Sequence, residues 1–257
     1  MRNVVRRTYS SKILKMKTLF ALFFLCLPFV GFSQKLPPTY PSHYFSFTET
    51  DSISYPTIYP DQTARDSIAD SYRNAHRRAK AIEKYALNKQ EIDFLNRIDG
   101  DQDQWSLTLT NDKKIKVGPR PRSHVVDYNF EYYHPSTGIL VFRVQWTEGN
   151  NYVLVSRKTG SKIETYGPPI FSPSEQYFIS YNGVEFTSYN KNGIQLFKLT
   201  KDGIEKLIDY STDLAPSRIK WKSDSTFALE MYNARPVQYE GMVRTYQHYQ
   251  TAIKATK

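Results

Sequence analysis

The sequence predicts a mainly β fold, with antiparallel meanders in a propeller-like arrangement and a short helical segment before them. From Trp105 onward, short runs of residues alternate between apolar and polar side chains, which is the period of a half-buried strand. Asn-Gly and Asp-Gly pairs separate several of these runs, and such pairs supply the positive φ angles of tight hairpins. An open stack of sheets or a β-sandwich satisfies the same pattern, so both stay open as alternatives.

Residues 1–33 have the three parts of a secretory signal peptide. A basic stretch without acidic residues comes first, an apolar run over residues 19–30 follows, and Gly31 and Ser33 provide the small residues before a cut ahead of Gln34. The apolar run is short for a bilayer span, which argues against a retained anchor. We therefore expect an exported protein, either periplasmic or extracellular, with no stable membrane span after signal removal.

Composition narrows the chemistry of the mature chain. Cys26 is the single cysteine and would leave with the signal, so we expect neither a disulfide nor a thiolate nucleophile. The net charge of +10 falls to +4 once the six basic residues of the signal are removed, leaving 29 basic against 25 acidic residues. This balance gives no electrostatic reason to expect a nucleic-acid partner.

Residues 34–60 form a segment rich in proline and tyrosine. Prolines at this density exclude a helix and favour extended backbone. The interleaved aromatic residues indicate that part of the segment packs along the folded domain, because a pure spacer rarely carries so many.

Residues 61–98 are predicted to be helical, since they contain neither glycine nor proline and their apolar residues recur near helical spacing. Asp61 is the expected N-cap, and a second helix is expected to start at Asn88, where Glu91 completes a capping box. A basic stretch within this segment is either a docking face for an anionic partner or an ordinary solvated face. It consists of Arg73, His76, Arg77, Arg78 and Lys80.

Residues 99–257 are expected to form the β-repeat domain. Predicted hairpins join residues 151–156 to 162–166, residues 185–189 to 194–199, and residues 194–199 to 204–208. Three stretches also align within this domain, each with an aromatic residue, a polar turn and a short apolar strand. They are residues 133–141, 171–179 and 221–229, and offsets of 38 and 50 residues are close to the spacing of propeller blades.

At Phe171-Ser-Pro-Ser-Glu175 and the hairpins after it, the chain resembles the WD40-like and TolB-like β-propeller repeats of exported proteins. The resemblance covers roughly residues 125–232 and implies a binding or scaffold module without transferring an active site. Ser174 and Glu175 stand where an Asp-Gly pair is usual in that family. Closed propellers generally have at least four blades. Either a partial fourth blade comes from residues 105–117 together with residues 242–249, or the strands form an open sheet stack or a sandwich.

The ionisable residues show no spacing that builds a metal or catalytic site. The five histidines, His43, His76, His124, His134 and His248, lack the i, i+4 pairing of zinc ligands. Asp99, Asp101 and Asp103 could ligate Ca²⁺, but Gln104 and Thr110 replace the glycine and glutamate of an EF-hand loop, and a polar turn explains the same residues. The abundant tyrosines, Tyr232, Tyr239, Tyr246 and Tyr249 among them, are either strand residues or a surface for stacking on sugars.

These observations predict a non-catalytic binding or scaffold protein of the cell envelope that recognises a protein or glycan, without a cofactor. The alternative is a hydrolase or lyase that acts on polysaccharide through carboxylates in a groove. Its candidate acids are Asp127, Glu131, Glu148 and Glu185, and nothing in their spacing selects two of them. A further alternative is a subunit of a larger secretion or surface complex, which would show an exposed apolar patch or an open sheet edge.

Overall fold

The structure, a computed structural model, describes most of the unit Tyr40–Lys257. The described residues are 43–52, 54–98, 101–119, 126–147, 149–183, 192–237 and 241–256. The predicted signal peptide, residues 1–33, lies outside them. In this part of the chain no helix is both long and apolar enough to cross a membrane.

Two helices, α1 (Gln62–Asp70) and α2 (Ala75–Gln90), precede most of the strands. Asp61 stands at the N-cap of α1 as expected, although its side chain makes no capping hydrogen bond and bonds Arg65 instead. At α2 the cap is Asn74, whose side-chain oxygen accepts a hydrogen bond from the backbone N–H of Arg77 at 3.0 Å. The helical segment is therefore confirmed, with a break between residues 70 and 75.

The predicted second helix start at Asn88 is wrong. Asn88 lies in the last turn of α2, which ends at Glu91 in left-handed backbone (φ +46°). The residues after it form the strand β2 (Leu95–Ile98) rather than a helix. Leu95 and Leu107 pair across the antiparallel ladder with β3 and are both buried, so sheet pairing prevails over the local capping pattern.

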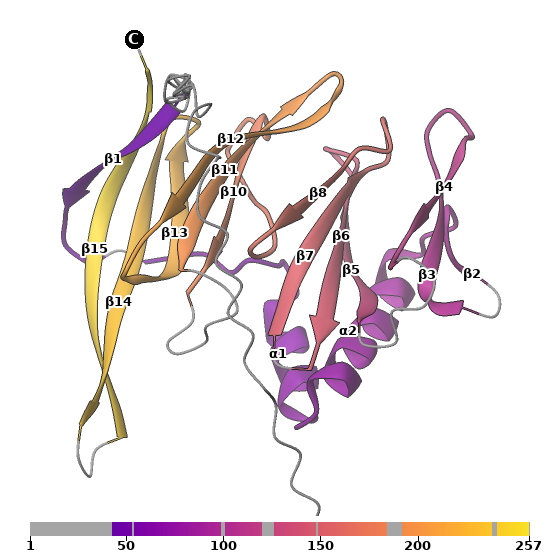
Figure 1. Cartoon of the computed structure of the whole chain (residues 1–257), viewed down its shortest axis with the longest axis horizontal. Helices are drawn as coiled ribbons and strands as arrows, with labels where there is room; N and C mark the ends of the chain where they lie inside the picture. The colour runs from indigo at the N-terminus through magenta and orange to yellow at the C-terminus, as the bar shows by residue number, and fades with distance from the viewer. Residues whose placement is uncertain are drawn as a thin grey trace, which may run out of the picture. The chain divides into compact units, whose positions relative to one another are not determined.

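Besides the helices, the described residues form four antiparallel sheets (Figure 1). The predicted mainly β fold with antiparallel meanders is thereby confirmed. Sheet I contains β2, β3 (Asp101–Thr108) and β4 (Lys114–Val117); sheet II contains β5 (Asp127–His134), β6 (Ile139–Trp146), β7 (Gly149–Ser156) and β8 (Lys162–Thr165). Sheet III contains β9 (Ile170–Phe171), β10 (Tyr177–Asn182), β11 (Gly193–Thr200) and β12 (Gly203–Ser211); sheet IV contains β13 (Ala215–Ser223), β14 (Thr226–Val237), β15 (Gly241–Ala255) and β1 (His43–Glu49).

In the described residues, two of the predicted tight turns contain the expected glycine. Gly160 lies between β7 and β8 with φ +76°, and Gly203 begins β12 with φ +142°. The predicted hairpin that begins at residues 185–189 falls outside the described residues. The strand β11 instead pairs with β10, in a register from Tyr177 opposite Lys198 to Asn182 opposite Gly193.

The three look-alike stretches occupy the same place in successive sheets. Each of the three stretches covers the end of one strand, the turn after it and the start of the next strand. Residues 133–141 join β5 to β6 in sheet II, residues 171–179 join β9 to β10 in sheet III, and residues 221–229 join β13 to β14 in sheet IV. Each first aromatic residue, Tyr133, Phe171 or Trp221, packs against a hydrophobic core cluster. The internal repeat is thus a repeat of structure as well as of sequence.

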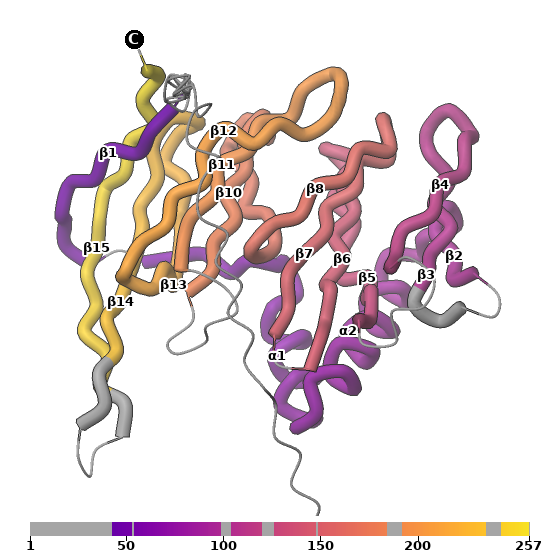
Figure 2. Tube along the Cα trace, viewed as in Figure 1, coloured from indigo at the N-terminus to yellow at the C-terminus, as the bar shows by residue number. Residues whose placement is uncertain are grey.

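Residues 105–117 and 242–249 do not form a fourth blade together. Residues 105–117 belong to sheet I, whereas residues 242–249 lie in β15 of sheet IV. Sheet IV is completed by β1 from the proline-rich N-terminal segment, which pairs with β15 from His43 opposite Ala255 to Glu49 opposite Tyr249. The tube in Figure 2 shows indigo β1 beside yellow β15, the two extremes of the described chain.

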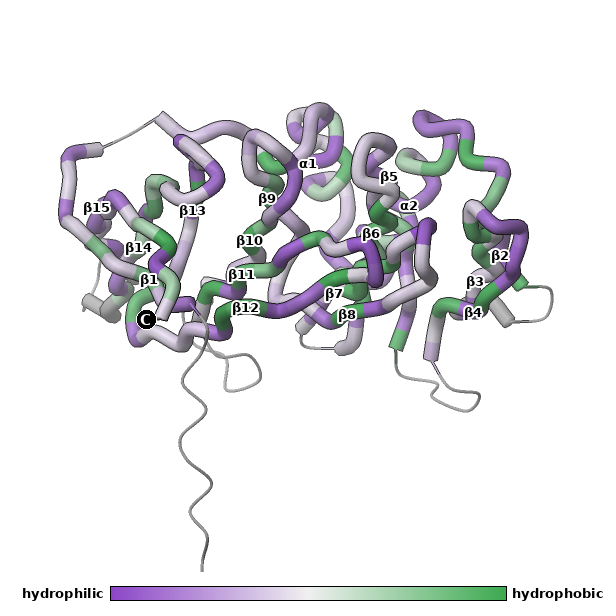
Figure 3. Tube along the Cα trace, turned by 90° about the horizontal axis from the view of Figure 1, so that it is seen from above, coloured by the Kyte–Doolittle hydropathy of each residue, from purple (hydrophilic) through white to green (hydrophobic). Residues whose placement is uncertain are grey.

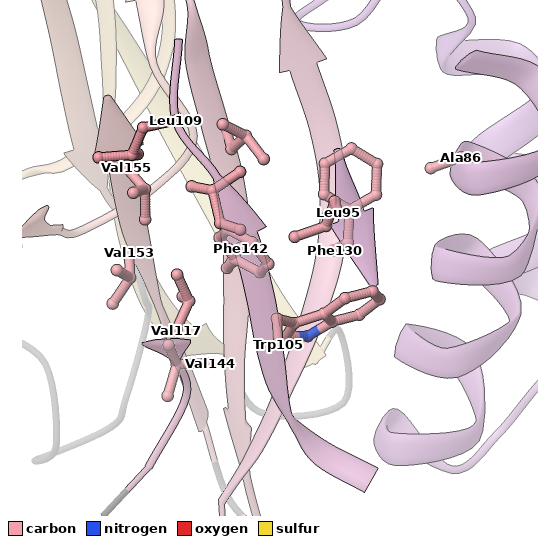
Figure 4. Packing of buried hydrophobic residues seen from close by; sticks show 12 residues of the cluster. Ala86, Leu95, Trp105, Leu109, Val117, Phe130, Phe142, Val144, Val153 and Val155 are labelled. Atoms are coloured by element: carbon pink, nitrogen blue, oxygen red, sulfur yellow. The ribbon is translucent and has the colours of Figure 1, made fainter. Parts of the chain in front are cut away.

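Three hydrophobic clusters join neighbouring sheets. Trp105 of sheet I, Phe130 and Phe142 of sheet II and Ala86 of α2 belong to the first, and Figure 4 shows them facing one another. Figure 3 shows apolar residues (green) recurring along β6, β7, β10 and β11. Residues of sheets II and III form one further cluster (Val141, Leu154, Phe178 and Phe197), and residues of sheets III and IV form the other (Ile194, Leu196, Phe227 and Leu229). These clusters show a stack of sheets in the order I to IV, and the propeller-like arrangement stays a prediction.

Sheets III and IV approach closely at Gly183, directly after β10. A Cβ atom at this position would collide with the carbonyl oxygen of Pro216 and lie 2.9 Å from its carbonyl carbon. We expect Gly183→Ala to lower the free energy of unfolding in urea by about 1–3 kcal/mol, because backbone on both sides must move. Gly138→Asn is the control, since no atom lies within 4 Å of that Cβ and asparagine tolerates its φ of +72°. Equal stabilities for the two variants would contradict the close approach.

Candidate functional site

Of the four acids considered for polysaccharide cleavage, the structure describes Asp127 and Glu131, and each of these two is held by its own partner. Glu148 and Glu185 lie outside the described residues. Asp127 is paired with His76, whose Nδ1 lies 2.6 Å from Oδ2 of the aspartate. Glu131 is buried beneath α1, with 4 % of its surface exposed. Neither Asp127 nor Glu131 lines any of the described pockets.

A β-bulge explains the position of Glu131. In the pairing of β5 with β6, Phe130 stands opposite Phe142 and Tyr132 opposite Val141, so Glu131 is the extra residue. Its carbonyl oxygen accepts a hydrogen bond from Nη2 of Arg65 at 2.8 Å, and its Oε2 lies 3.5 Å from Nη1 of the same arginine. The hydroxyl of Tyr59 donates a further hydrogen bond to Oε2 at 3.2 Å.

Asp61 completes this cluster at the start of α1. Its Oδ1 accepts a hydrogen bond from Nε of Arg65 at 2.8 Å, and its Oδ2 lies 3.7 Å from Nζ of Lys89. Burial would raise the pKa of Asp61, but the hydrogen bond and charge of Arg65 outweigh it and hold that pKa below its ordinary value. Nη1 of Arg143 also lies 3.9 Å from Oε1 of Glu131. Through the shared Arg65, the Asp61–Arg65–Glu131 cluster fastens α1 to sheet II.

The described histidines are also distributed singly. His134 Nε2 lies 3.9 Å from Glu175 and His248 Nδ1 lies 3.8 Å from Glu230, while His76 pairs with Asp127 as above. His43 is in β1, and His124 lies outside the described residues. In the part of the chain that the structure describes, no three His, Cys, Asp or Glu side chains gather into a group that could hold a metal ion.

The other residues that the sequence suggested as sites are the aspartates after residue 98, the C-terminal tyrosines and the basic stretch. The structure either gives them packing or surface positions or does not describe them. The side chains of Asp99, Asp101 and Asp103 lie outside the described residues, as does Tyr239. Tyr232 and Tyr246 pack ring against ring at 5.7 Å, and Tyr249 packs on the core between sheets III and IV. Within the basic stretch, Arg78 donates to the carbonyl oxygen of Tyr72 at 3.0 Å, while Arg73, Arg77 and Lys80 are exposed.

The structure instead concentrates pockets around residues 55–60, which we name the crossing segment. This segment leads from β1 to α1 and lines pockets together with residues of β5, β9 and β13. One pocket, of about 480 Å³, is the Arg218 pocket; it is lined by Tyr55, Gln62, Asp66, Tyr181, Ser217 and Arg218 among others. The other, of about 340 Å³, is the Glu175 pocket; it is lined by Tyr59, Tyr132, His134, Ile170, Phe171 and Glu175 among others. Pro56, Thr57 and Ile58 line both.

Hydrogen bonds order the wall of the Arg218 pocket. The hydroxyl of Tyr181 donates to the carbonyl oxygen of Ser217 at 2.6 Å, and the hydroxyl of Ser217 donates to Oε1 of Glu230 at 2.6 Å. Burial, followed by the charge of Glu230, raises the pKa of Tyr55 to about 12 against the opposing charge of Arg218. The phenols of this pocket are thus neutral near pH 7, and the exposed Arg218 side chain supplies a cation at its rim.

Aromatic rings form the wall of the Glu175 pocket. The Tyr59 ring lies 5.8 Å from that of Tyr132, the Tyr132 ring 6.1 Å from that of His134, and the His134 ring 4.3 Å from that of Phe171. Burial lowers the pKa of His134, with the Glu175 carboxylate acting in the opposite direction, so the imidazole is neutral near pH 7. The wall can therefore offer flat apolar faces together with one carboxylate.

No family model matches the chain, and no curated protein matches it. The proposed function therefore rests on the geometry of the two pockets. Sequence reasoning did not identify these residues as a site, because they come from segments far apart in the chain. The available signal was the density of proline and aromatic residues before residue 61, which correctly indicated packing against the domain.

Proposed function

We propose that this chain is an exported, non-catalytic binding or scaffold protein of the cell envelope, which recognises a protein or glycan at the crossing segment. The observation that carries the proposal is the pair of pockets that Pro56, Thr57 and Ile58 both line. Their volumes of about 480 and 340 Å³ fall in the range of ligand sites. The propeller-like family resemblance and the predicted signal peptide support the same proposal from the sequence.

The lining of the pockets favours binding over catalysis by paired carboxylates. Asp66 is the acidic residue that lines the Arg218 pocket, and Glu175 is the one that lines the other. Hydrolysis of a glycosidic bond requires two carboxyl groups that flank it. Glu83 has a pKa raised by burial, yet it is bonded to Arg97 at 2.6 Å and to the backbone N–H of Phe130, and it lines neither pocket.

Tyrosine and proline give these pockets a chemistry suited to recognition. Tyr55, Tyr181 and Tyr132 offer large contact area at low entropy cost, together with hydroxyl groups for polar contacts. Prolines fix the backbone of the crossing segment, so little freedom is lost when a ligand binds against it. Export to the periplasm or cell exterior would place such a surface among envelope proteins and polysaccharides.

Thr57→Trp tests the proposal, because Thr57 is exposed and lines both pockets. Purified protein is titrated against a panel of polysaccharide fragments and extended peptides by biolayer interferometry. For any bound member, the indole at position 57 should fill the pockets and weaken affinity at least about tenfold, which corresponds to about 1.4 kcal/mol.

Thr63→Trp is the matched control, since Thr63 is an exposed threonine on α1 that lines neither pocket. It should leave affinity unchanged. Unaltered binding by Thr57→Trp would place the binding surface elsewhere. Release of shorter fragments from a polysaccharide by the wild-type protein would overturn the non-catalytic assignment in favour of the hydrolase or lyase alternative.

A further inference from the structure

Glu175 occupies a backbone position that disfavours its side chain. It lies in the turn between β9 and β10 with φ +59°, the left-handed region that costs non-glycine residues roughly 1–2 kcal/mol. In the corresponding turn between β5 and β6, the left-handed residue is Gly138, with φ +72°, which aligns with the residue after Glu175. Glu175 lines a pocket, and strained backbone is often found at residues with a function. The strained conformation of Glu175 therefore indicates that its side chain has a role in the pocket.

The charges around the Glu175 pocket leave it acidic. Glu175 lines it, and in the described part of the chain no lysine or arginine does. His134, which faces Glu175 from β5 at 3.9 Å, is kept neutral by burial. Behind the Tyr59 ring lies Arg65, but the carboxylates of Asp61 and Glu131 compensate its charge.

The aromatic wall suits a cation as well. Ring faces attract cations through the quadrupole of the π-system, and acid together with aromatic rings is the combination that recognises ammonium groups. The Tyr59 ring already accepts such a contact on one face, where the guanidinium carbon of Arg65 lies 4.3 Å from the ring centroid. The rings of Tyr132 and Phe171 flank His134 within the same lining.

We propose that the Glu175 pocket binds an alkylammonium group, with the Glu175 carboxylate as its counter-ion and Tyr132 and Phe171 as its aromatic wall. This inference rests on the proposed function, because it names the ligand chemistry of one of its two pockets. The group can belong to a lysine side chain of a protein or to a quaternary ammonium of a small molecule or lipid headgroup. In both cases the ligand is an ammonium cation attached to an alkyl chain.

Two pairs of probes test the proposal by NMR or calorimetric titration of the full protein. Choline is compared with 3,3-dimethylbutan-1-ol, its uncharged isostere, and Nα-acetyl-lysine methylamide with the norleucine derivative. The wild-type protein should bind at least one cation about tenfold more tightly than its neutral partner. The pair that shows the preference identifies the source, whereas equal weak binding of all four probes would overturn the proposal.

Substitutions of Glu175 distinguish an effect on cation binding from an effect on stability. Glu175→Asn and Glu175→Gly both accept left-handed backbone, so neither should lower the thermal midpoint, yet each should weaken cation binding about tenfold. Glu205→Gln, which removes an exposed acid of β12 that lines no described pocket, should bind as the wild type does. Undiminished cation binding by Glu175→Gly would overturn the proposal.

The outcomes also distinguish this inference from the proposed function. If no ammonium probe binds but another ligand is lost with Thr57→Trp, the ammonium assignment fails and the binding function stands. If an ammonium probe binds and Thr57→Trp leaves it unaffected, the carboxylate site stands and the role of the crossing segment fails.

Discussion

Arg65→Met should lower the free energy of unfolding by about 3–5 kcal/mol, because it removes the buried cation that the Asp61 and Glu131 carboxylates share. Arg65 is 3 % exposed and contacts Asp61 at 2.8 Å and Glu131 at 3.5 Å. Both acids would then be paired less completely in a region from which water is largely excluded. Urea unfolding followed by circular dichroism measures the loss.

The loss should depend on pH in a defined direction. Since the pKa of Asp61 is depressed in the folded protein, its contribution to stability is present above the unfolded pKa of about 3.9 and disappears as pH falls through the folded value. The difference between wild type and Arg65→Met should therefore be largest near neutral pH and narrow in acid. A difference that stays constant down to acid pH would contradict the role of the Asp61 carboxylate.

Two further variants control this result. Arg73→Met removes an exposed arginine between the two helices and should change stability by less than about 0.5 kcal/mol. Adding Glu131→Gln to Arg65→Met should recover part of the loss, because it removes one of the stranded charges. A loss below about 1 kcal/mol for Arg65→Met would show that the Asp61–Arg65–Glu131 cluster does not hold α1 to sheet II.

Trp105→Ala should cost about 3–5 kcal/mol and loosen sheet I in particular. Trp105 is 1 % exposed, its indole N–H donates to the carbonyl oxygen of Tyr128 at 2.9 Å, and its ring lies 5.9 Å from that of Phe142. The guanidinium of Arg97 also stacks over it at 4.0 Å. Removing the indole therefore takes away contacts that bind sheet I to sheet II.

Hydrogen exchange locates this effect. Amides of β2 to β4 should lose protection in Trp105→Ala, while those of β14 and β15 keep theirs. Trp105→Phe retains part of the packing and reports on the same contacts if the alanine variant does not fold. Tyr44→Ala, at a tyrosine of β1 that is 50 % exposed, should alter stability by less than about 0.5 kcal/mol. Uniform loss of protection across all four sheets would contradict a local role of Trp105.

Sequence reasoning succeeded for features that depend on neighbours along the chain. Gly160 and Gly203 marked hairpins because positive φ is a property of the residue itself. The helix start predicted from Asn88 and Glu91 was wrong. A capping box depends only on residues close in the chain, whereas the strand forms because Leu95 is buried opposite Leu107. The bulge that turns Glu131 toward Arg65 has no marker in the sequence, since it depends on the register between β5 and β6.

The alternation of polarity and the placement of turn residues by themselves determined that this protein is a repeated antiparallel β structure with helices before it. Only the tertiary structure decided that β1 completes sheet IV, that β3 and β15 belong to different sheets, and that the crossing segment lines two pockets. The physical reason is that hairpin strands pair with their neighbours in the chain at little entropic cost. The partners of β1 and of residues 55–60 lie far away in sequence, and their pairing depends on burial and charge that no local pattern records.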